Sequence, residues 1–303
     1  MTNKQESALF TYTLHDWVDQ EKLDWKILSS NPNAVDLLKR NPEKIDWCNL
    51  SENPNAMHLL EENPEKIDWC KLSGNPNAVH LLEENPEKID WYELSGNPNA
   101  MHLLEKNPEE IEWDLLSSNP NAIHLLEKTP DNINWSELSL NPNAFETYLL
   151  EEYEEYIDWW SLSSNPIPNA IYLLEENQDE IVWCALSQNP NAIHLLEENP
   201  EKIDWCKLSG NLNAIHLLEK NPEKIDWCEL SGNPNAIHLL EKNPEKIYHM
   251  YGFNCNPSIF KKVVNYDFLK ERMDIIREEL IMKCMHPKRL EKWLEMGGEI
   301  DDF

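Results

Sequence analysis

The sequence has few basic residues. Lys and Arg number 26 against 56 Asp and Glu in 303 residues, which gives a formal net charge of −30. DNA and RNA phosphates are bound by basic patches that displace counterions, and anionic membrane surfaces attract basic segments. The composition therefore disfavours nucleic acid and membranes as partners. It favours a protein partner, either a basic one or one that carries little charge.

Long apolar runs and a secretory segment are also absent. No run approaches the length of a transmembrane helix, and residues 1–6 have no secretory apolar core. The seven cysteines are an odd number, and five of them recur at one position of a repeat: Cys48, Cys70, Cys184, Cys206 and Cys228. Stacked units would hold them about 9–10 Å apart, whereas a disulfide needs Cα atoms within about 7 Å. We expect reduced thiols and an intracellular protein.

Sequence motifs that carry catalysis are missing as well. The chain has no phosphate-binding loop, dinucleotide fingerprint, HExxH or GxSxG motif, and no EF-hand spacing. A histidine recurs once per unit, at a spacing of about 10 Å that is too wide for a shared zinc ion. We therefore expect no catalytic residue, no metal, no cofactor and no small-molecule substrate.

The dominant feature of the sequence is a 22-residue repeat. Residues 189–210 read NPNAIHLLEENPEKIDWCKLSG, and we number these letters as positions 1–22. Ten units run from residue 31 to about residue 254, and those with an intact Asn-Pro-Asn-Ala begin at Asn31, Asn53, Asn75, Asn97, Asn119, Asn141, Asn189 and Asn233. One such unit cannot bury its own apolar face, but stacked units can, so the period predicts a solenoid.

Each unit contains two Asn-Pro pairs, at positions 1–2 and 11–12. Asn is a good N-cap and Pro is favoured at the first helical position, so each pair predicts the start of a short helix. Positions 2–10 have an amphipathic helical pattern, whereas positions 12–20 repeat every three residues, which is typical of a 3₁₀ or mixed helix. We expect the Trp and Cys positions to lie in the core. The His at position 6 should face solvent and pair with the Glu at position 10.

The segment NPNAIHLLEENPEKIDW (residues 189–205) resembles the short helical repeat proteins that giant DNA viruses of protists encode in many copies. The alternation of a Pro-started helix with a period-three segment is also similar to the leucine-rich repeat variant, an α/3₁₀ solenoid. The viral resemblance implies no defined activity. It implies the cytoplasm of an infected host cell, or the virus particle, as the location.

These patterns predict an all-α solenoid of about ten 22-residue units with helical caps at both ends. We expect an N-terminal cap and half repeat at 1–30, the solenoid at 31–254 and a C-terminal helical cap at 255–303. An amphipathic helix is expected at 267–285. The cap from residue 249 onward has a net charge of only −1, so the acidic charge belongs to the repeats.

The centre of the array, residues 143–170, departs from the pattern. It gains four residues, and Tyr153-Glu154 replaces an Asn-Pro pair, which predicts one longer helix from about Asn143 to Tyr156. Aromatic residues replace the usual His and Cys here. Because large aromatic side chains dominate interface energetics, we expect the partner to contact these five residues: Tyr148, Tyr153, Tyr156, Trp160 and Tyr172. The alternative is that they only repack the chain around the insertion.

The sequence therefore favours a non-catalytic protein-interaction scaffold with a long acidic surface. Acidic residues that flank the centre, such as Glu109, Glu112, Glu201 and Asp204, would steer a basic partner. A structural component of a virus particle is the alternative that the resemblance suggests. An enzyme is the least favoured class, because five equivalent Cys and His positions do not make one preorganised pocket.

Overall fold

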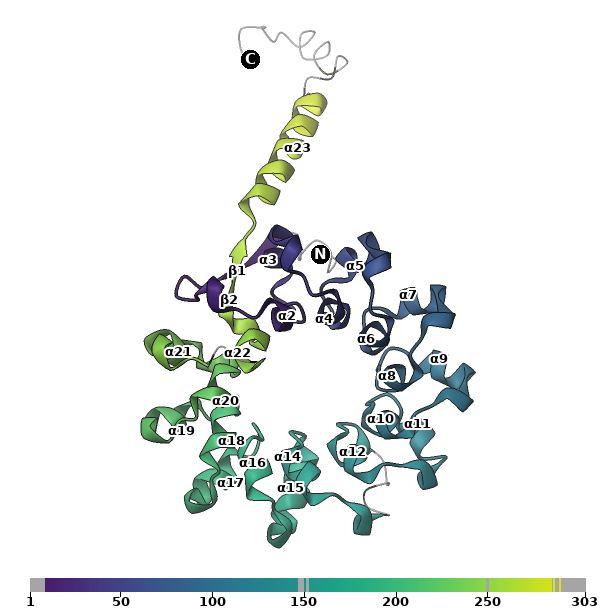
Figure 1. The fold of residues 1–303 in the computed structure, drawn as a ribbon, viewed down its shortest axis with the longest axis vertical. Coiled ribbons are helices and arrows are strands. Elements are labelled where there is room, and N and C mark those ends of the chain that lie inside the picture. Colours follow the sequence, from purple (N-terminus) through teal and green to yellow (C-terminus); the bar gives the residue numbers. More distant parts are fainter. Residues whose placement is uncertain are drawn as a thin grey trace. The chain divides into compact units, whose positions relative to one another are not determined.

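The computed structural model describes residues 9–146, 150, 153–248, 251–284, 286 and 289. It divides into two compact units. One runs from Leu14 to Phe260, and the other combines Met1–Thr13 with Lys261–Phe303. The first unit holds the repeats and confirms the all-α solenoid (Figure 1). No described helix has the length and apolarity needed to cross a bilayer.

Apart from the unit that begins at Asn141, whose first part is only partly described, each repeat folds into a first α-helix, a 3₁₀ helix and a second α-helix. The first helices are α3 (Val35–Arg40), α5 (Met57–Glu62), α7 (Val79–Glu84), α9 (Met101–Lys106), α11 (Ile123–Leu126), α15 (Pro168–Glu176), α17 (Ile193–Glu198), α19 (Ile215–Lys220) and α21 (Ile237–Lys242). The 3₁₀ helices between them and the second helices are η2 (Pro42–Lys44), η3 (Pro64–Lys66), η4 (Pro86–Lys88), η5 (Pro108–Glu110), η6 (Pro130–Asn132), η8 (Glu154–Tyr156), η9 (Gln178–Glu180), η10 (Pro200–Lys202), η11 (Pro222–Lys224) and η13 (Pro244–Lys246).

The second helices begin at the tryptophan of each repeat. They are α2 (Trp25–Leu28), α4 (Trp47–Glu52), α6 (Trp69–Gly74), α8 (Trp91–Ser95), α10 (Trp113–Ser118), α12 (Trp135–Leu140), α14 (Trp159–Ser164), α16 (Trp183–Ser187), α18 (Trp205–Gly210) and α20 (Trp227–Ser231), followed by α22 (Tyr251–Cys255). Further 3₁₀ turns are η1 (Gln20–Lys22), η7 (Ala144–Glu146), η12 (Pro234–Ala236) and η14 (Pro257–Ile259).

The three-residue periodicity at positions 12–20 arises from two elements in succession. A 3₁₀ turn at positions 12–14 is followed by two extended residues and then an α-helix. The helix is capped by the Asp at position 16: the side chain of Asp68 accepts a hydrogen bond from the backbone N–H of Lys71 at 3.2 Å. Asn63, the predicted cap of the 3₁₀ turn, instead donates its side-chain amide to the carbonyl of Leu59 at 2.9 Å. It therefore closes the helix before it.

The core is built from small and medium side chains. The Ala at position 4 and the Leu residues at positions 8 and 20 have almost no exposed surface throughout the array, as Ala78, Leu82 and Leu94 illustrate. Two polar positions, the Asn at position 1 and the Ser at position 21, are equally buried. Buried polar groups are costly unless they are hydrogen-bonded, so their partners are part of the fold.

The buried Asn residues form a ladder between units. The Asn53 side chain donates to the carbonyls of Ser29 and Asn31 at 3.0 and 2.9 Å, and its oxygen accepts from the backbone N–H of Asn55 at 3.0 Å. Ser51 adds a second link, because its hydroxyl donates to Trp47 O at 2.8 Å and accepts from the N–H of Asp68 in the next unit at 3.0 Å. The inter-unit contacts are therefore partly polar and directional.

The expectation that the Cys residues lie in the core is wrong. Cys48, Cys70, Cys184, Cys206 and Cys228 are all exposed. In an α-helix that begins at position 17, position 18 lies about 200° from the buried Leu at position 20, on the opposite face. The tryptophans are only half-buried, so the core assignment holds for them in part.

The array from Leu14 to Phe260 closes on itself. Each second helix packs on the next from α4 to α20, α20 packs on α22 and α22 on α2 (Figure 1). The circuit is completed between α2 and α4, where the Asn49 side chain donates to Lys26 O at 2.8 Å and the Asn53 side chain to Ser29 O at 3.0 Å.

At the seam, the Asn31 side chain donates to the carbonyls of Asn254 and Asn256 at 2.8 and 3.1 Å. The last unit thus contacts the first through the same hydrogen bonds that each unit makes with its successor. The ends of the array therefore meet, in contrast to the two separate caps we expected.

The segments at the two ends differ from the expected helical caps. Residues near the N-terminus form strand β1 (Phe10–Leu14), which pairs with β2 (Phe260–Val264). The N–H of His15 donates to Ile259 O at 3.0 Å and the N–H of Asn265 to Leu9 O at 2.9 Å, a register that makes the pair antiparallel. The alternating pattern of β2 is strand-like rather than helical. The predicted C-terminal helix is confirmed as α23 (Tyr266–Cys284).

The predicted long helix at the centre is wrong. Residues 154–156 form the separate turn η8, although no proline begins it. Tyr153 has backbone angles of φ −120° and ψ 40°, close to the −132° and 59° of Asn85 at the equivalent place. The conformation that ends the first helix therefore persists without the Asn-Pro pair. The Tyr153 ring packs on Trp135, which holds the segment there.

Candidate functional site

A groove runs between successive units of the array. Between the second and third units it is lined by residues from both: Glu61, Pro64, Ile67, Trp69, His80, Leu81, Glu84, Asn85 and Lys88. The groove one unit earlier has the equivalent lining and contains Trp47, His58 and Lys66. Their volumes are about 400 and 350 Å³. The structural period therefore repeats a concave surface as well as a core.

A lysine of the chain itself lies over the tryptophan in these regular grooves. The Lys88 Nζ is 4.4 Å from the centre of the Trp69 ring, and Lys66 lies at the same distance from Trp47. The other pairs of this kind are Lys44–Trp25, Lys202–Trp183, Lys224–Trp205 and Lys246–Trp227, at 4.2–4.7 Å. Each lysine is the third residue of the 3₁₀ helix in the following unit. An ammonium over an indole face is an attractive contact.

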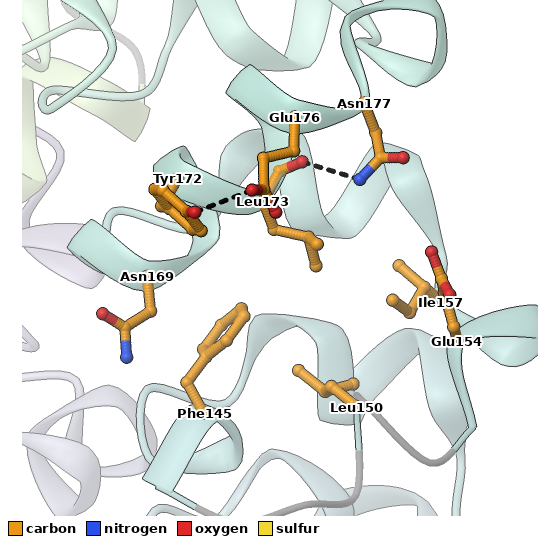
Figure 2. Close-up of a pocket in the computed structure, with 9 residues that line it drawn as sticks. All are labelled: Phe145, Leu150, Glu154, Ile157, Asn169, Tyr172, Leu173, Glu176 and Asn177. Carbon is orange, nitrogen blue, oxygen red and sulfur yellow. Dashed lines mark hydrogen bonds between the residues drawn. The ribbon is translucent and has the colours of Figure 1, made fainter.

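The groove at the irregular centre is larger, at about 520 Å³. Figure 2 shows the residues that line it: Phe145, Leu150, Glu154, Ile157, Asn169, Tyr172, Leu173, Glu176 and Asn177. Its apolar wall is formed by Phe145, Leu150, Ile157 and Leu173. Two carboxylates, those of Glu154 and Glu176, supply its charge. We take this central groove as the candidate site.

Tyr172 stands at the edge of the central groove on α15. It is 60% exposed, and its hydroxyl donates a hydrogen bond of 2.7 Å to Glu176 Oε1 (Figure 2). This hydrogen bond raises the pKa of the Tyr172 hydroxyl. It also holds the Glu176 side chain against the ring.

The predicted anchor residues differ in their surroundings. Tyr153 and Tyr156 pack on Trp135, with ring centres 5.1 and 5.3 Å away, and the Tyr156 ring is stacked on it. Trp160 is 52% exposed on α14 and does not line the central groove, whereas Tyr172 does. Tyr148 lies outside the described residues. The structure therefore brings only Tyr172 to the groove among the described anchors.

The acidic residues that we expected to steer a partner differ in their exposure to solvent. Glu109, Glu112 and Glu201 are exposed. Asp204 is half-buried, and its carboxylate accepts a hydrogen bond of 3.1 Å from the N–H of Lys207 as the cap of α18. The first three can attract a positively charged partner from solvent, whereas Asp204 has a structural role as a helix cap.

The histidine row pairs differently from our expectation. His80 Nε2 lies 3.0 Å from Glu61 Oε1 in the preceding unit rather than beside Glu84 on its own helix. The same contact recurs at 2.8–3.0 Å in His102–Glu83, His124–Glu105, His194–Glu175, His216–Glu197 and His238–Glu219. Stacking brings position 9 of one unit next to position 6 of the following unit, which helical spacing within one unit does not reveal. Both side chains are about half exposed, so each pair adds little stability.

The cysteine row lies beside carboxylates. A hydrogen bond with Asp68 is the main cause that raises the pKa of Cys48. Desolvation, followed by a hydrogen bond with Asp90, raises the pKa of Cys70 to about 11. Such thiols are poor nucleophiles at neutral pH, because the thiolate is the reactive form. Within the described part of the chain, no three His, Cys, Asp or Glu residues are grouped as metal ligands would be.

Sequence reasoning missed Phe145, Glu154 and Glu176 as parts of the site. Glu176 occupies a position that is Glu, Lys or Arg elsewhere, and Phe145 stands where other units have Ile, Val or Met. A comparison of the units position by position would have identified Phe145 but not Glu176. It would not have shown that two successive units share one groove.

Comparison of the chain with protein-family models, with curated proteins and with solved structures finds no match. The structure thus defines a class, a closed array of α/3₁₀ repeats, and function is inferred from the grooves between its units.

Proposed function

We propose that this protein is a non-catalytic interaction scaffold and that the central groove is where it binds a protein partner. The observation that carries the proposal is the contrast between grooves. The regular groove contains Lys88 as well as carboxylates, whereas the central groove has a larger volume and is lined by carboxylates and apolar residues with no lysine. Concave apolar surfaces with a few polar groups are where proteins bind other molecules.

The charge of the surface favours a basic partner. Exposed carboxylates surround the groove on both neighbouring units, among them Glu154, Glu155, Glu175, Glu176 and Glu180. A field of one sign steers an oppositely charged protein toward its site and makes association sensitive to salt. The intracellular location that we expect for this protein is part of the proposal.

The test replaces two residues that line the central groove by those that other units have at the same positions. Phe145→Ile combined with Tyr172→His gives position 5 and position 6 their ordinary residues, so the fold should be retained. The wild-type chain and this variant are compared by affinity capture from the native cells, followed by binding of the identified partner as a purified protein. We expect the variant to lose a basic partner that the wild type retains.

A matched control removes an exposed aromatic residue elsewhere. Tyr92 on α8 is 54% exposed, and Tyr92→Ser introduces the residue found at the same position in α12. This control should capture the partner at the wild-type yield. Recovery of the same partners by the double variant, at undiminished yield, would refute the central groove as the binding site.

A further inference from the structure

Four consecutive tryptophans of the array lack the lysine that covers the others. At the third residue of the following 3₁₀ helix, Trp91 is matched with Glu110, Trp113 with Asn132, Trp135 with Tyr156 and Trp159 with Glu180. Among the described residues, these four tryptophans have no cation over the ring in the structure, while the other six do. Tyr156 stacks on Trp135 and takes the place of the cation there.

The remaining three tryptophans differ in the charge around them. A second residue also lines each groove, the one at position 10, which is Glu84 beside Trp69. The equivalent residue is Lys106 in the groove of Trp91 and Lys128 in that of Trp113. In the unit that follows Trp159 it is Glu176, which lines the central groove, and Glu180 replaces the lysine. This unit is the only one in the sequence that has acidic residues at both positions. Trp159 and Glu180 themselves are not among the residues that line the groove, and their place beside it follows from the repeat.

The regular grooves show which side chain binds over a tryptophan of the array. In each of them a lysine stem crosses the groove wall and its ammonium rests over the indole of the preceding unit. Ile157, Leu173, Glu176 and Asn177 line the central groove just as Ile67, Leu81, Glu84 and Asn85 line the regular one. Trp159 follows Ile157 by two residues, as Trp69 follows Ile67, and begins the same helix. Four lining positions are therefore the same in both grooves, and the repeat sets Trp159 and Glu180 beside them where Trp69 and Lys88 stand in the regular groove.

We propose that the central groove binds a lysine side chain of the basic protein partner, with its ammonium over the Trp159 ring and between the carboxylates of Glu176 and Glu180. The inference rests on the proposed function, and it names the group that is recognised. The partner supplies from outside the cation that six other units supply themselves. Glu154 on the opposite wall adds a third carboxylate, and Phe145 and Leu150 extend the apolar wall along which the lysine stem or a neighbouring residue lies.

The contact is strong enough to matter only because several terms coincide. A cation over an indole is attracted to the ring at an exposed site, and more strongly when it is desolvated. Carboxylates on both sides strengthen the attraction further and disfavour an uncharged side chain. Loss of the site should therefore weaken binding of a short lysine peptide about tenfold.

The experiment fills the site from within the chain. Glu180→Lys places a lysine at the end of η9, where Lys202 ends η10 and Lys88 ends η4. It should cover Trp159 and exclude the ligand. Asp179→Lys changes the net charge equally, but its position is the second residue of the turn, which is Glu in most units. The residue over the indole in the regular units is the third. The probe is a fluorescein-labelled peptide with one lysine among glycines and serines, and its partner peptide carries acetyl-lysine.

We expect the lysine peptide to bind the wild type and the Asp179→Lys variant with dissociation constants that agree within about twofold, and Glu180→Lys about tenfold more weakly. The acetylated peptide should bind all three weakly. Addition of the lysine peptide should also shift the NMR signal of one indole N–H, the one missing in Trp159→Phe. Equal weakening by both lysine variants, or a perturbed indole other than that of Trp159, would overturn the inference, because it would indicate attraction by net charge alone.

The outcome also separates this inference from the proposed function. If the partner depends on Phe145 and Tyr172 but is insensitive to Glu180→Lys, the groove is a binding site and the lysine assignment is wrong. If the peptide binds as expected while the double variant of the groove captures the same partners as the wild type, the lysine site exists and the proposed role of the groove is wrong.

Discussion

The side-chain amide of Asn31 donates a hydrogen bond of 2.8 Å to the backbone carbonyl of Asn254, 223 residues further along the chain. The bond is equivalent to the one that Asn53 makes with Ser29 across 24 residues. A contact that joins successive units elsewhere in the array thus joins the first unit to the last. It shows that repetition of one inter-unit interface brings the last unit of the array back to the first.

Removal of that contact should weaken the seam. In Asn31→Ala two buried carbonyls lose their donor, and an unsatisfied buried acceptor costs about 1–3 kcal/mol. We expect the free energy of unfolding to fall by this amount and the backbone amides near Asn254 and Asn256 to exchange faster with deuterium. Denaturant unfolding and hydrogen-exchange mass spectrometry measure the two effects.

Asn97→Ala is the control for the seam, because Asn97 makes the same bonds to Ser73 and Asn75 in the interior. Its loss of stability should be similar, while exchange near Asn254 stays at the wild-type rate. If Asn31→Ala leaves both stability and exchange unchanged, the seam is not closed in solution.

The stability of each unit should depend on its buried leucines rather than on its exposed row. Leu94 has no exposed surface, whereas Tyr92, two residues earlier on α8, is 54% exposed. Leu94→Ala should lower the free energy of unfolding by about 2–5 kcal/mol, because it removes buried methyl groups and leaves a cavity. Tyr92→Ala should change it by about 0.5 kcal/mol or less. Equal losses in denaturant unfolding would contradict the burial pattern of the second helices.

His58 should titrate below the ordinary range of histidine. Burial, followed by the charge of Lys39, lowers the pKa of His58 from 6.5. Its Nε2 is buried and has no hydrogen-bond partner among the described residues, because Lys39 stands where later units have the paired glutamate. Unfolded chains bind the proton near pH 6.5 and the folded chain only at lower pH. Stability should therefore fall as the pH decreases below about 6.5.

The variant Lys39→Glu restores the pairing found at His80 and Glu61 and should raise the pKa of His58. NMR titration of the imidazole measures the change. Lys39→Gln is the control, because it removes the positive charge without adding a carboxylate and should raise the pKa less. A pKa of His58 that is the same in all three proteins would show that position 9 does not contact the histidine.

Cys70 should react slowly with iodoacetamide although it is exposed. Its pKa is raised to about 11, so only a small fraction is thiolate at pH 8.5, and the rate should continue to rise with pH toward 11. Asp90→Asn removes the charge but keeps a side chain that can cap α8. This variant should alkylate Cys70 several times faster at pH 8.5. Mass spectrometry of the peptide containing Cys70 measures the rate, and Asp114→Asn, a change on another unit, should leave it unaltered.

Prediction from sequence was most accurate where a unit depends on its own residues. The buried Ala and Leu of the first helix follow from a spacing that any helix obeys, and the period itself demands stacked units. It was least accurate at the second helix. There a 3₁₀ turn, an extended pair and a helix in succession imitate one regular three-residue pattern, which led to the wrong placement of the cysteines.

At the candidate site, too, the sequence identified some residues correctly and others not. Tyr172 could be found because it replaces a histidine at a known position. Trp160 was selected by the same reasoning, yet it lies on the exposed face of α14, away from the groove. Tyr153 and Tyr156 pack on Trp135, a contact that the sequence did not reveal. A residue that departs from the repeat can be found in the sequence, but the sequence does not show which side chains surround that residue.

By itself the sequence determined the repeat, its length, the short helices and the acidic surface, because these depend on residues that are neighbours along the chain. Only the tertiary structure decided that the array closes, that His80 pairs with Glu61 and that Lys88 covers Trp69. Each of these depends on the rotation from one unit to the next. A small rotation, set by how buried Asn, Ser and Leu side chains pack, accumulates over the whole array, and no single unit contains it.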